Sequence, residues 1–253
     1  MSKSLLGLVS AEECAFLRSV SRGVVVEVGS LGGLSASCFA DGGAEEIHCF
    51  DTFRLFEPNV AYARMLGLPP DFVGSFLPVF LRNTEAFRDR LVVHECDALA
   101  GGWDRPIDVL FVDCSVGTEF QLGLVEKFYR HLVPGGLLIH QDFFYNRSPC
   151  LAPLMARLSG AFEIVKNVDT SMVYRRGVGE IPGSVTLDIG VELPREIGRF
   201  GGLDAVAGAV LATALVYWLR GEGRLMEADE LTLDIIHAQG GRRVWENLRE
   251  AHQ

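Results

Sequence analysis

The chain has 253 residues, 49% of them hydrophobic and 22% charged, which is typical of one large packed domain with an appendage. Its formal net charge of -10 argues against a nucleic-acid backbone as ligand, because phosphate binding needs clustered Lys and Arg. Six cysteines without any C-x-x-C pair argue against a zinc knuckle and predict reduced thiols in a cytoplasmic protein.

The N-terminal stretch MSKSLLGLVSAEE lacks a long apolar core and a cleavage site, so we expect no signal peptide. Ser10, followed three residues later by Glu13, is typical of a capping box, in which each side chain binds a backbone N–H of the first helical turn. The sequence therefore predicts a helix from this point to about Val20.

The stretch VVVEVGSLGGLSAS at residues 24–37 has the pattern of a strand, a glycine turn and a helix. Its valines form a short apolar run, typical of a strand that is buried on both faces. Gly29, Gly32 and Gly33 then turn the chain before the predicted helix. This order is the front end of a βαβ nucleotide-binding unit, where glycines let the backbone approach a ligand closely.

The spacing of the glycines in this turn distinguishes a dinucleotide site, a phosphate-binding loop and a SAM site from one another. A dinucleotide fingerprint needs glycine at the first, third and sixth positions, which are Gly29, Leu31 and Leu34 here, so it fails twice. A phosphate-binding P-loop needs a Lys that is absent. Glu27 would repel a pyrophosphate but suits a ligand with an ammonium group, such as S-adenosylmethionine (SAM), which has no phosphate. The alternative is a glycine turn in an α/β protein that binds nothing there.

Acidic residues end four successive predicted strands. The strands over 46–51, 91–97, 107–113 and 137–142 end at Asp51, Asp97, Asp113 and Asp142. Asp51 lies 22 residues after Gly29, where an acid typically binds the ribose hydroxyls of an adenosine. Its alternative role is to cap a turn. Because open α/β sheets bind ligands at the carboxyl ends of their strands, the four acids together predict a site.

Residues 54–80 interrupt the alternation of strands and helices with four prolines among many apolar side chains. We expect a helical insert that folds over the cofactor end of the sheet and supplies substrate contacts. Further along, helical spacing runs over 119–132 until Pro134-Gly135-Gly136 stops it, and another helix is predicted over 151–159. Two strands around residues 167–170 predict a hairpin that closes the sheet.

The C-terminal part is predicted to be separate. Residues 1–180 form the predicted SAM-binding domain, 181–200 a linker, and 201–253 a helical hairpin. The apolar stretch 205–219 has only 15 residues, which is too short for a bilayer. It is apolar on more than one face, so it packs on the first domain or on a second copy. We expect packing on a second copy, which makes the protein a homodimer.

In this order, the motifs resemble the class I SAM-dependent methyltransferases, and most of all the subgroup of macrocin O-methyltransferase and cephalosporin hydroxylase-like proteins. The matching pieces are VVVEVGSLGGLSAS, CFDTF, the segment from Arg82-Asn83 to Asp97, IDVLFVD and LVPGGLLIHQDF. Together with the order of elements, the resemblance predicts an α/β fold with a Rossmann-like, doubly wound, mostly parallel sheet and a C-terminal helical appendage.

The resemblance also implies roles for single residues. The methionine part of SAM would be held by Glu27 and by the loop at Gly29, Ser30, Gly32, Gly33 and Ser35. The ribose would be held by Asp51 with Thr52, and the adenine would lie at Asp97 with Cys96. Asp113 would lie beside the transferable methyl group.

Metal-dependent members of this family carry a polar run with a His after the fourth strand and paired acids at the fifth. Here Cys114 follows Asp113, and Gln141 precedes Asp142. Asp113 and Asp142 could hold a Mg²⁺ with waters, since that ion commonly uses one or two carboxylates. We expect metal-free catalysis, because Gln141 replaces an anionic ligand.

The predicted function is SAM-dependent O-methylation of a small hydroxylated molecule, such as a sugar or a specialised metabolite. A hydroxyl acceptor must lose a proton, and His140 and Asp142 are the candidate bases, with a buried structural role as the alternative for His140. Two other functions stay open. One is a SAM-binding sensor or assembly partner without methyl transfer. The other is a nicotinamide-dependent oxidoreductase, which Leu31 and Leu34 disfavour.

Overall fold

The computed structural model describes residues 7–114, 117–144, 148–203, 205–224, 226 and 228. They form two compact units. The first unit lies within residues 1–114, 123–141 and 160–181 and contains the main sheet. The second lies within residues 115–122, 142–159 and 182–253 and contains the C-terminal helices.

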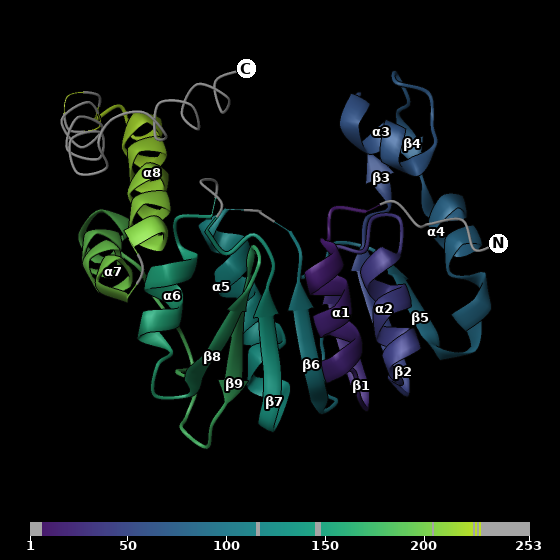
Figure 1. Cartoon of the computed structure of the whole chain (residues 1–253), viewed down its shortest axis with the longest axis horizontal. Helices are drawn as coiled ribbons and strands as arrows, with labels where there is room; N and C mark the ends of the chain where they lie inside the picture. The colour runs from purple at the N-terminus through teal and green to yellow at the C-terminus, as the bar shows by residue number, and fades with distance from the viewer. Residues whose placement is uncertain are drawn as a thin grey trace. The chain divides into compact units, whose positions relative to one another are not determined.

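A seven-stranded sheet with the order β5-β2-β1-β6-β7-β9-β8 forms the centre of the first unit (Figure 1). Its strands are β1 (Val24–Val28), β2 (Glu46–Asp51), β5 (Leu91–Glu95), β6 (Ile107–Val112), β7 (Leu132–His140), β8 (Phe162–Val168) and β9 (Ser171–Arg176). The first five strands in this order are parallel, and β9 runs antiparallel to both of its neighbours. The predicted α/β class, the mostly parallel sheet and the closing hairpin are confirmed.

Helices α1 (Ala11–Val20) and α2 (Leu34–Gly42) cover one face of the sheet. The predicted capping box begins α1: the Glu13 N–H donates to Ser10 Oγ at 3.2 Å, and the Ser10 N–H donates to Glu13 Oε2 at 2.9 Å. Glu13 Oε1 also accepts from the hydroxyls of Thr170 and Ser171, at 3.1 and 2.6 Å. The start of α1 is thereby tied to the turn between β8 and β9.

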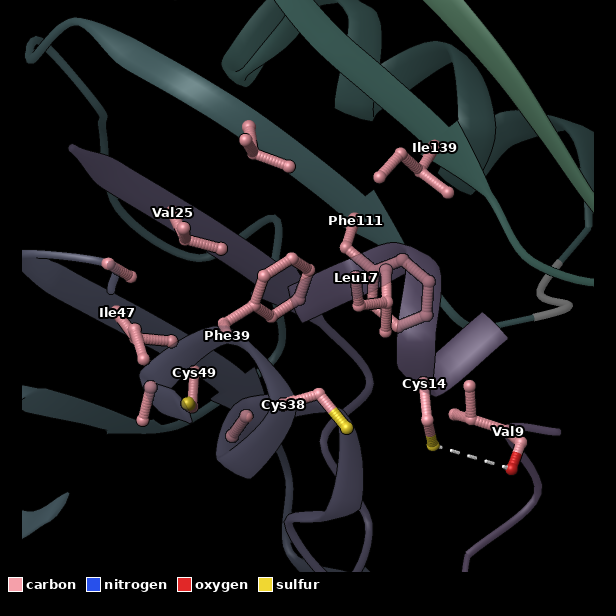
Figure 2. Packing of buried hydrophobic residues seen from close by; sticks show 14 of the residues in the cluster. Val9, Cys14, Leu17, Val25, Cys38, Phe39, Ile47, Cys49, Phe111 and Ile139 are labelled. Carbon is pink, nitrogen blue, oxygen red and sulfur yellow. Dashed lines mark hydrogen bonds between the residues drawn. The ribbon is translucent and has the colours of Figure 1, made fainter. Parts of the chain in front are cut away.

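The hydrophobic core lies between these helices and the sheet (Figure 2). Leu17 of α1 and Phe39 of α2 meet Val25, Phe111 and Ile139 from three strands, and all five side chains are essentially inaccessible to solvent. The rings of Phe39 and Phe111 pack edge to face with centroids 5.8 Å apart. Burying each such side chain contributes about 1.5–3 kcal/mol, so this layer fixes how α2 follows β1.

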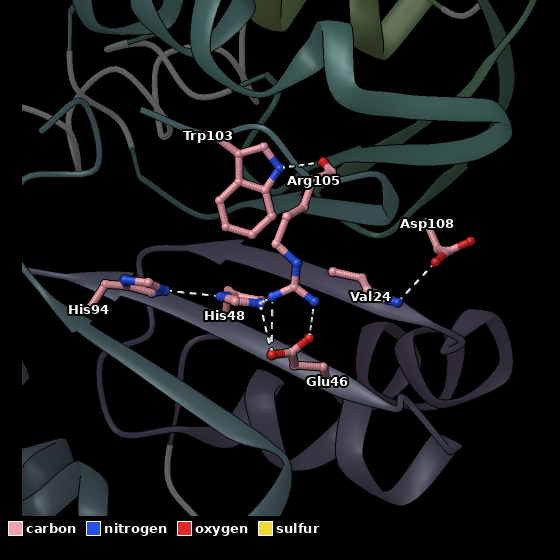
Figure 3. Close-up of polar contacts among 7 residues, drawn as sticks. All are labelled: Val24, Glu46, His48, His94, Trp103, Arg105 and Asp108. Carbon is pink, nitrogen blue, oxygen red and sulfur yellow. Dashed lines mark hydrogen bonds and ion pairs between the residues drawn. The ribbon is translucent and has the colours of Figure 1, made fainter. Parts of the chain in front are cut away.

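On β2, a polar cluster occupies part of the sheet surface (Figure 3). Arg105 pairs with Glu46 and places Nη1 3.0 Å from His48 Nε2, while His48 Nδ1 lies 3.0 Å from His94 Nε2. Burial lowers the pKa of both histidines. His48 Nε2 also lies 3.3 Å from Glu46 Oε1, so Arg105, Glu46 and the two histidines form one connected polar cluster. Residues 96–106 contain no helix, so Trp103 and Arg105 cover this surface instead.

The insert after β2 is partly helical, as predicted, but it also contains a short ribbon. Its elements are β3 (Arg54–Leu55), α3 (Val60–Leu66), β4 (Gly74–Ser75), α4 (Leu77–Asn83) and the 3₁₀ helix η1 (Glu85–Arg90). Strands β3 and β4 pair antiparallel. The Phe76 N–H donates to the Phe53 carbonyl at 2.7 Å, and the Phe53 ring lies 4.8 Å from that of Phe80. The insert is therefore closed on its own apolar side chains.

The helix predicted over 119–132 ends earlier than expected. α5 (Thr118–Lys127) is followed by the 3₁₀ helix η2 (Tyr129–His131), and β7 begins at Leu132. The Pro134-Gly135-Gly136 run lies inside β7, where the register with β6 shifts between the pairs Ile107–Leu132 and Val109–Leu137. Proline has no N–H for the ladder, so an irregularity in the pairing accommodates it.

The second unit contains a helix where a linker was predicted. Its helices are α6 (Leu151–Arg157), α7 (Ile189–Leu203) and α8 (Ala205–Gly221). Ile189, Leu193 and Phe200 are buried along one side of α7, although Pro194 lies inside it. An internal proline costs about 3 kcal/mol, and burying three large apolar side chains contributes more than that. This balance explains why the helix forms.

α8 agrees with the first helix of the hairpin predicted over 201–253, whereas most of the rest of that hairpin lies outside the described residues. Leu211, Ala214, Val216 and Leu219 of α8 are buried within the single chain. Across the described part of the chain, no helix combines the length and apolar character needed to cross a membrane.

Candidate functional site

The glycine loop crosses the carboxyl edge of the sheet between β1 and α2. The Gly29 N–H donates to the Phe50 carbonyl at 2.9 Å, and the Asp113 N–H donates to the Val28 carbonyl at 2.8 Å. Gly29 has φ +89°, and a Cβ atom there would lie 2.2 Å from the Asp113 carbonyl oxygen. Only glycine therefore fits where the loop leaves β1 and passes the end of β6.

Asp51, at the end of β2, binds the loop backbone. Its Oδ2 accepts from the N–H groups of Ser30 and Leu31, both at 3.0 Å, and its Oδ1 accepts from the Phe53 N–H at 2.7 Å. Leu31 has φ +40°, a left-handed conformation that costs a residue with a Cβ about 1–2 kcal/mol. The carboxylate holds it there. Since a carboxylate offers about four acceptor positions, one remains for a ligand hydroxyl.

Glu27 is completely buried beneath the same loop. Its Oε2 accepts from the Ser30 hydroxyl at 2.6 Å, while Oε1 has no hydrogen-bond partner within the described part of the chain. Burial raises the pKa of Glu27 to about 7, although the neighbouring Ser30, Ser35 and Cys49 side chains lower it, and the charge of Asp51 raises it further. A buried carboxyl with an unpartnered oxygen fits a cationic group and repels a phosphate.

Three of the four predicted strand-end acids lie near one another. Burial raises the pKa of the Cys114 thiol well above its ordinary value, and the charges of Asp113, Asp51 and Asp97 add to the shift. Asp97 is exposed, and its Oδ1 accepts from the Leu99 N–H at 2.8 Å. The Cys96 N–H donates to the Asp51 carbonyl at 3.0 Å, which joins the ends of β5 and β2.

His140 lies in the interior at the end of β7. It is fully buried, its Nε2 lies 2.6 Å from the Tyr129 hydroxyl, and burial lowers its pKa to about 3. The His140 side chain is therefore uncharged at neutral pH. Strand β7 ends at His140, and Asp142 has φ +54°, so strand alternation does not relate the two side chains. His140 as the base stays a prediction, and its burial favours the structural alternative.

Gln141 has a partner that the sequence did not reveal. Its Nε2 donates to Thr170 Oγ1 at 3.2 Å, and Thr170 in turn donates to Glu13. Gln141 is thus bound to the β8–β9 turn. Asp142 follows it in the second unit and is half-buried. Within the residues that the structure describes, no group of three or more His, Cys, Asp or Glu side chains could hold a metal ion. The two-carboxylate Mg²⁺ site at Asp113 and Asp142 stays a prediction.

The remaining predicted residues belong to the same loop or to its edge. Gly33 has φ +89° and is the N-cap of α2, Ser35 is buried in its first turn, and Thr52 is exposed beside Asp51. Asn83 was part of a matching segment but had no predicted role. Its Nδ2 donates to the Gly32 carbonyl at 2.9 Å.

Comparison with known proteins identifies the kind of domain that this chain carries. Residues 26–143 match the family described as methyltransferase domain. The chain carries a SAM-dependent methyltransferase domain. The protein is accordingly a methyltransferase with SAM as its cofactor. No curated protein matches the chain.

Solved structures share the fold of this methyltransferase at low identity. The O-methyltransferase NovP is 14% identical, with 68% of this chain and 82% of that chain covered and a TM-score of 0.52. An O-methyltransferase from Bacillus cereus in complex with SAH is 16% identical, with 69% and 84% covered and a TM-score of 0.47. An rRNA methylase from Streptococcus thermophilus is 13% identical, with 68% and 99% covered and a TM-score of 0.47. At 14% identity, the likeness to NovP shows the fold alone.

The close approach of Gly29 to the Asp113 carbonyl predicts that Gly29→Ala strongly lowers the stability of the protein. Gly43 is the matched control, because it has φ +100° but nothing within 4 Å of an added Cβ. Both substitutions carry about 1–2 kcal/mol of backbone strain. We expect Gly29→Ala to cost about 1–3 kcal/mol more, because of the clash with Asp113. Urea unfolding measures both, and equal losses of stability would contradict the close approach.

The raised pKa of Glu27 predicts pH-dependent cofactor binding. If Glu27 holds the ligand ammonium, only its ionised carboxyl binds that group, so the affinity for S-adenosylhomocysteine (SAH) should be highest above pH 7. It should fall about tenfold per pH unit below pH 7, as the empty site takes up a proton. Calorimetry between pH 5.5 and 7.5 measures this. Glu27→Gln should bind weakly with a flat profile, and the same slope in that variant would refute the assignment.

Proposed function

We propose that this methyltransferase transfers the methyl group of SAM to a hydroxyl oxygen of a small molecule, such as a sugar or a specialised metabolite. The buried Glu27 carboxyl beside the glycine loop carries the proposal, because it suits an ammonium ligand. The net charge of -10 disfavours a nucleic-acid acceptor. The shared fold with NovP, named as an O-methyltransferase, supports oxygen as the acceptor atom.

Each part of the cofactor has candidate residues. Glu27 and the loop from Gly29 to Gly33 would hold the methionine part. Asp51, with one acceptor position left, would bind one ribose hydroxyl, with Thr52 beside it. The adenine would lie at Asp97 and Cys96, next to Asp51 at the ends of the paired strands β5 and β2.

SAM supplies a methyl group on a positively charged sulfur. In the proposed reaction, a new O–CH₃ bond forms as the S–CH₃ bond breaks, and its electron pair stays on the sulfur of SAH. The acceptor hydroxyl gives its proton to a base. We assign this role to Asp142, which is half-buried, in preference to His140, which is buried against Tyr129. Asp113 would lie at the methyl group.

The finer assignments also stand as proposals. The motif order favours the subgroup of macrocin O-methyltransferase and cephalosporin hydroxylase-like proteins, and buried free thiols at Cys14, Cys38, Cys49 and Cys150 suit a cytoplasmic protein. A homodimer was predicted from the two apolar faces of α8. The α8 side chains Leu211, Ala214, Val216 and Leu219 are buried within the chain, so the dimer now rests on the sequence pattern alone.

The role of Asp142 predicts that Asp142→Asn lowers kcat about 10²–10⁴-fold, because the variant cannot take up the acceptor proton. Asn tolerates the left-handed backbone at this position. Asp169→Asn is the matched control, since Asp169 is exposed and has φ +51°. Turnover of labelled SAM with a panel of phenols and sugars gives kcat, and calorimetry gives SAH affinity.

We expect SAH affinity to be unchanged in both variants and EDTA to leave turnover unaffected. Full activity of Asp142→Asn would remove Asp142 as the base. Loss of activity in EDTA, restored by Mg²⁺, would instead support a metal at Asp113 and Asp142.

A further inference from the structure

Helix α4 of the insert is bound to the glycine loop between β1 and α2. Asn83 is the last residue of α4, and its Nδ2 donates to the Gly32 carbonyl at 2.9 Å. A carbonyl oxygen only accepts, so the amide nitrogen is the one atom of this side chain that can form the bond. The next residue, Thr84, is fully buried, and its Cγ2 would lie 2.5 Å from a Cβ at Gly33. The loop and the end of α4 are thus in direct contact.

The start of the insert is bound to the same loop. The Asp51 carboxylate accepts from Ser30 and Leu31 of the loop and from Phe53 at the first turn of the insert. Three consecutive loop residues, 30–32, are therefore held by the two ends of one segment, 51–83. The Phe76–Phe53 backbone bond of 2.7 Å closes this segment on itself.

The geometry points to Asn83 as a positioning residue for SAM binding, and we propose that it links the insert to the occupancy of the loop. It touches the loop and acts through the Gly32 carbonyl, which follows the left-handed Leu31. Holding this carbonyl keeps the loop in one conformation before the ligand arrives, which lowers the cost of binding. Because such coupling is reciprocal, a ligand in the loop also stabilises the insert.

This inference rests on the glycine loop as the cofactor site. SAH affinity of the unmodified protein tests that site, and SAH affinity of an Asn83 variant tests the inference. In Asn83→Ala, we expect SAH to bind about tenfold more weakly, which corresponds to about 1.4 kcal/mol. Asn59→Ala is the matched control, because Asn59 lies in the same insert and its Oδ1 accepts from the Tyr62 N–H at 3.1 Å, away from the loop. We expect the affinity of this control to stay within twofold of that of the unmodified protein.

A merely structural role for Asn83 would lower the melting temperature of the empty protein without weakening SAH binding. SAH affinity of Asn83→Ala within twofold of the unmodified protein would therefore overturn the proposal. So would equal losses of affinity in Asn83→Ala and Asn59→Ala. Failure of the unmodified protein to bind SAH would overturn the cofactor site itself, and the inference with it.

A second measurement uses the unmodified protein, so it tests the coupling even if the Asn83 variant does not fold. Hydrogen exchange reports the backbone N–H groups of Phe76 and Thr84, which donate to Phe53 and Phe80 inside the insert. We expect saturating SAH to slow exchange at both amides, because the ligand stabilises the insert through Asn83. Where Asn83→Ala folds, saturating SAH should protect them less. Unchanged exchange at both amides on adding SAH would refute the coupling.

Discussion

The site depends on one carboxylate that accepts three backbone N–H groups. Asp51 ends β2 and binds Ser30 and Leu31 in the loop after β1, together with Phe53 in its own turn. Hydrogen bonds to a charged group contribute about 1.5–3 kcal/mol each, which exceeds the about 1–2 kcal/mol of left-handed strain at Leu31. Asp51 therefore shapes the loop before any ligand binds, and the order of strands places both partners side by side.

The same edge of the sheet favours a cation. Glu27 is buried one strand away from Asp51, and the Glu27 charge adds to the effect of burial in raising the pKa of the Cys49 thiol. Asp113, Asp51 and Asp97 act in the same direction on Cys114. A negative charge on the buried Glu27 carboxyl is unfavourable unless a proton or a cationic ligand compensates it. A sulfonium ligand with an ammonium group meets this requirement, and a pyrophosphate does not.

Much of the fold follows from local pattern in the sequence. The apolar run around Val26 predicted a central strand, Ser10 with Glu13 predicted the start of α1, and acids at successive strand ends predicted an edge with a ligand site. These features depend on residues close in sequence. α7 was not predicted, because residues 181–200 were assigned to a linker although Ile189, Leu193 and Phe200 have helical spacing.

The contacts that shape the site could not be predicted, because they join distant parts of the chain. An Asp at a strand end has the same sequence pattern whether it accepts from ribose or from backbone N–H groups. Gln141 binds Thr170, 29 residues away, and Asn83 binds Gly32, 51 residues away. A single sequence contains the donors and acceptors but not their pairing, which is fixed by the tertiary fold.

Hydrogen exchange of the empty Asp51→Ala protein, read at the Ser30 and Leu31 amides, tests the central claim most directly. Alanine has no acceptor, so both of these backbone donors lose the carboxylate oxygen to which they donate. We predict faster exchange at Ser30 and Leu31 without ligand, and SAH affinity reduced at least about tenfold. If Asp51 served only to bind ribose, SAH affinity would fall while exchange in the empty protein stayed unchanged, and that result would contradict the account.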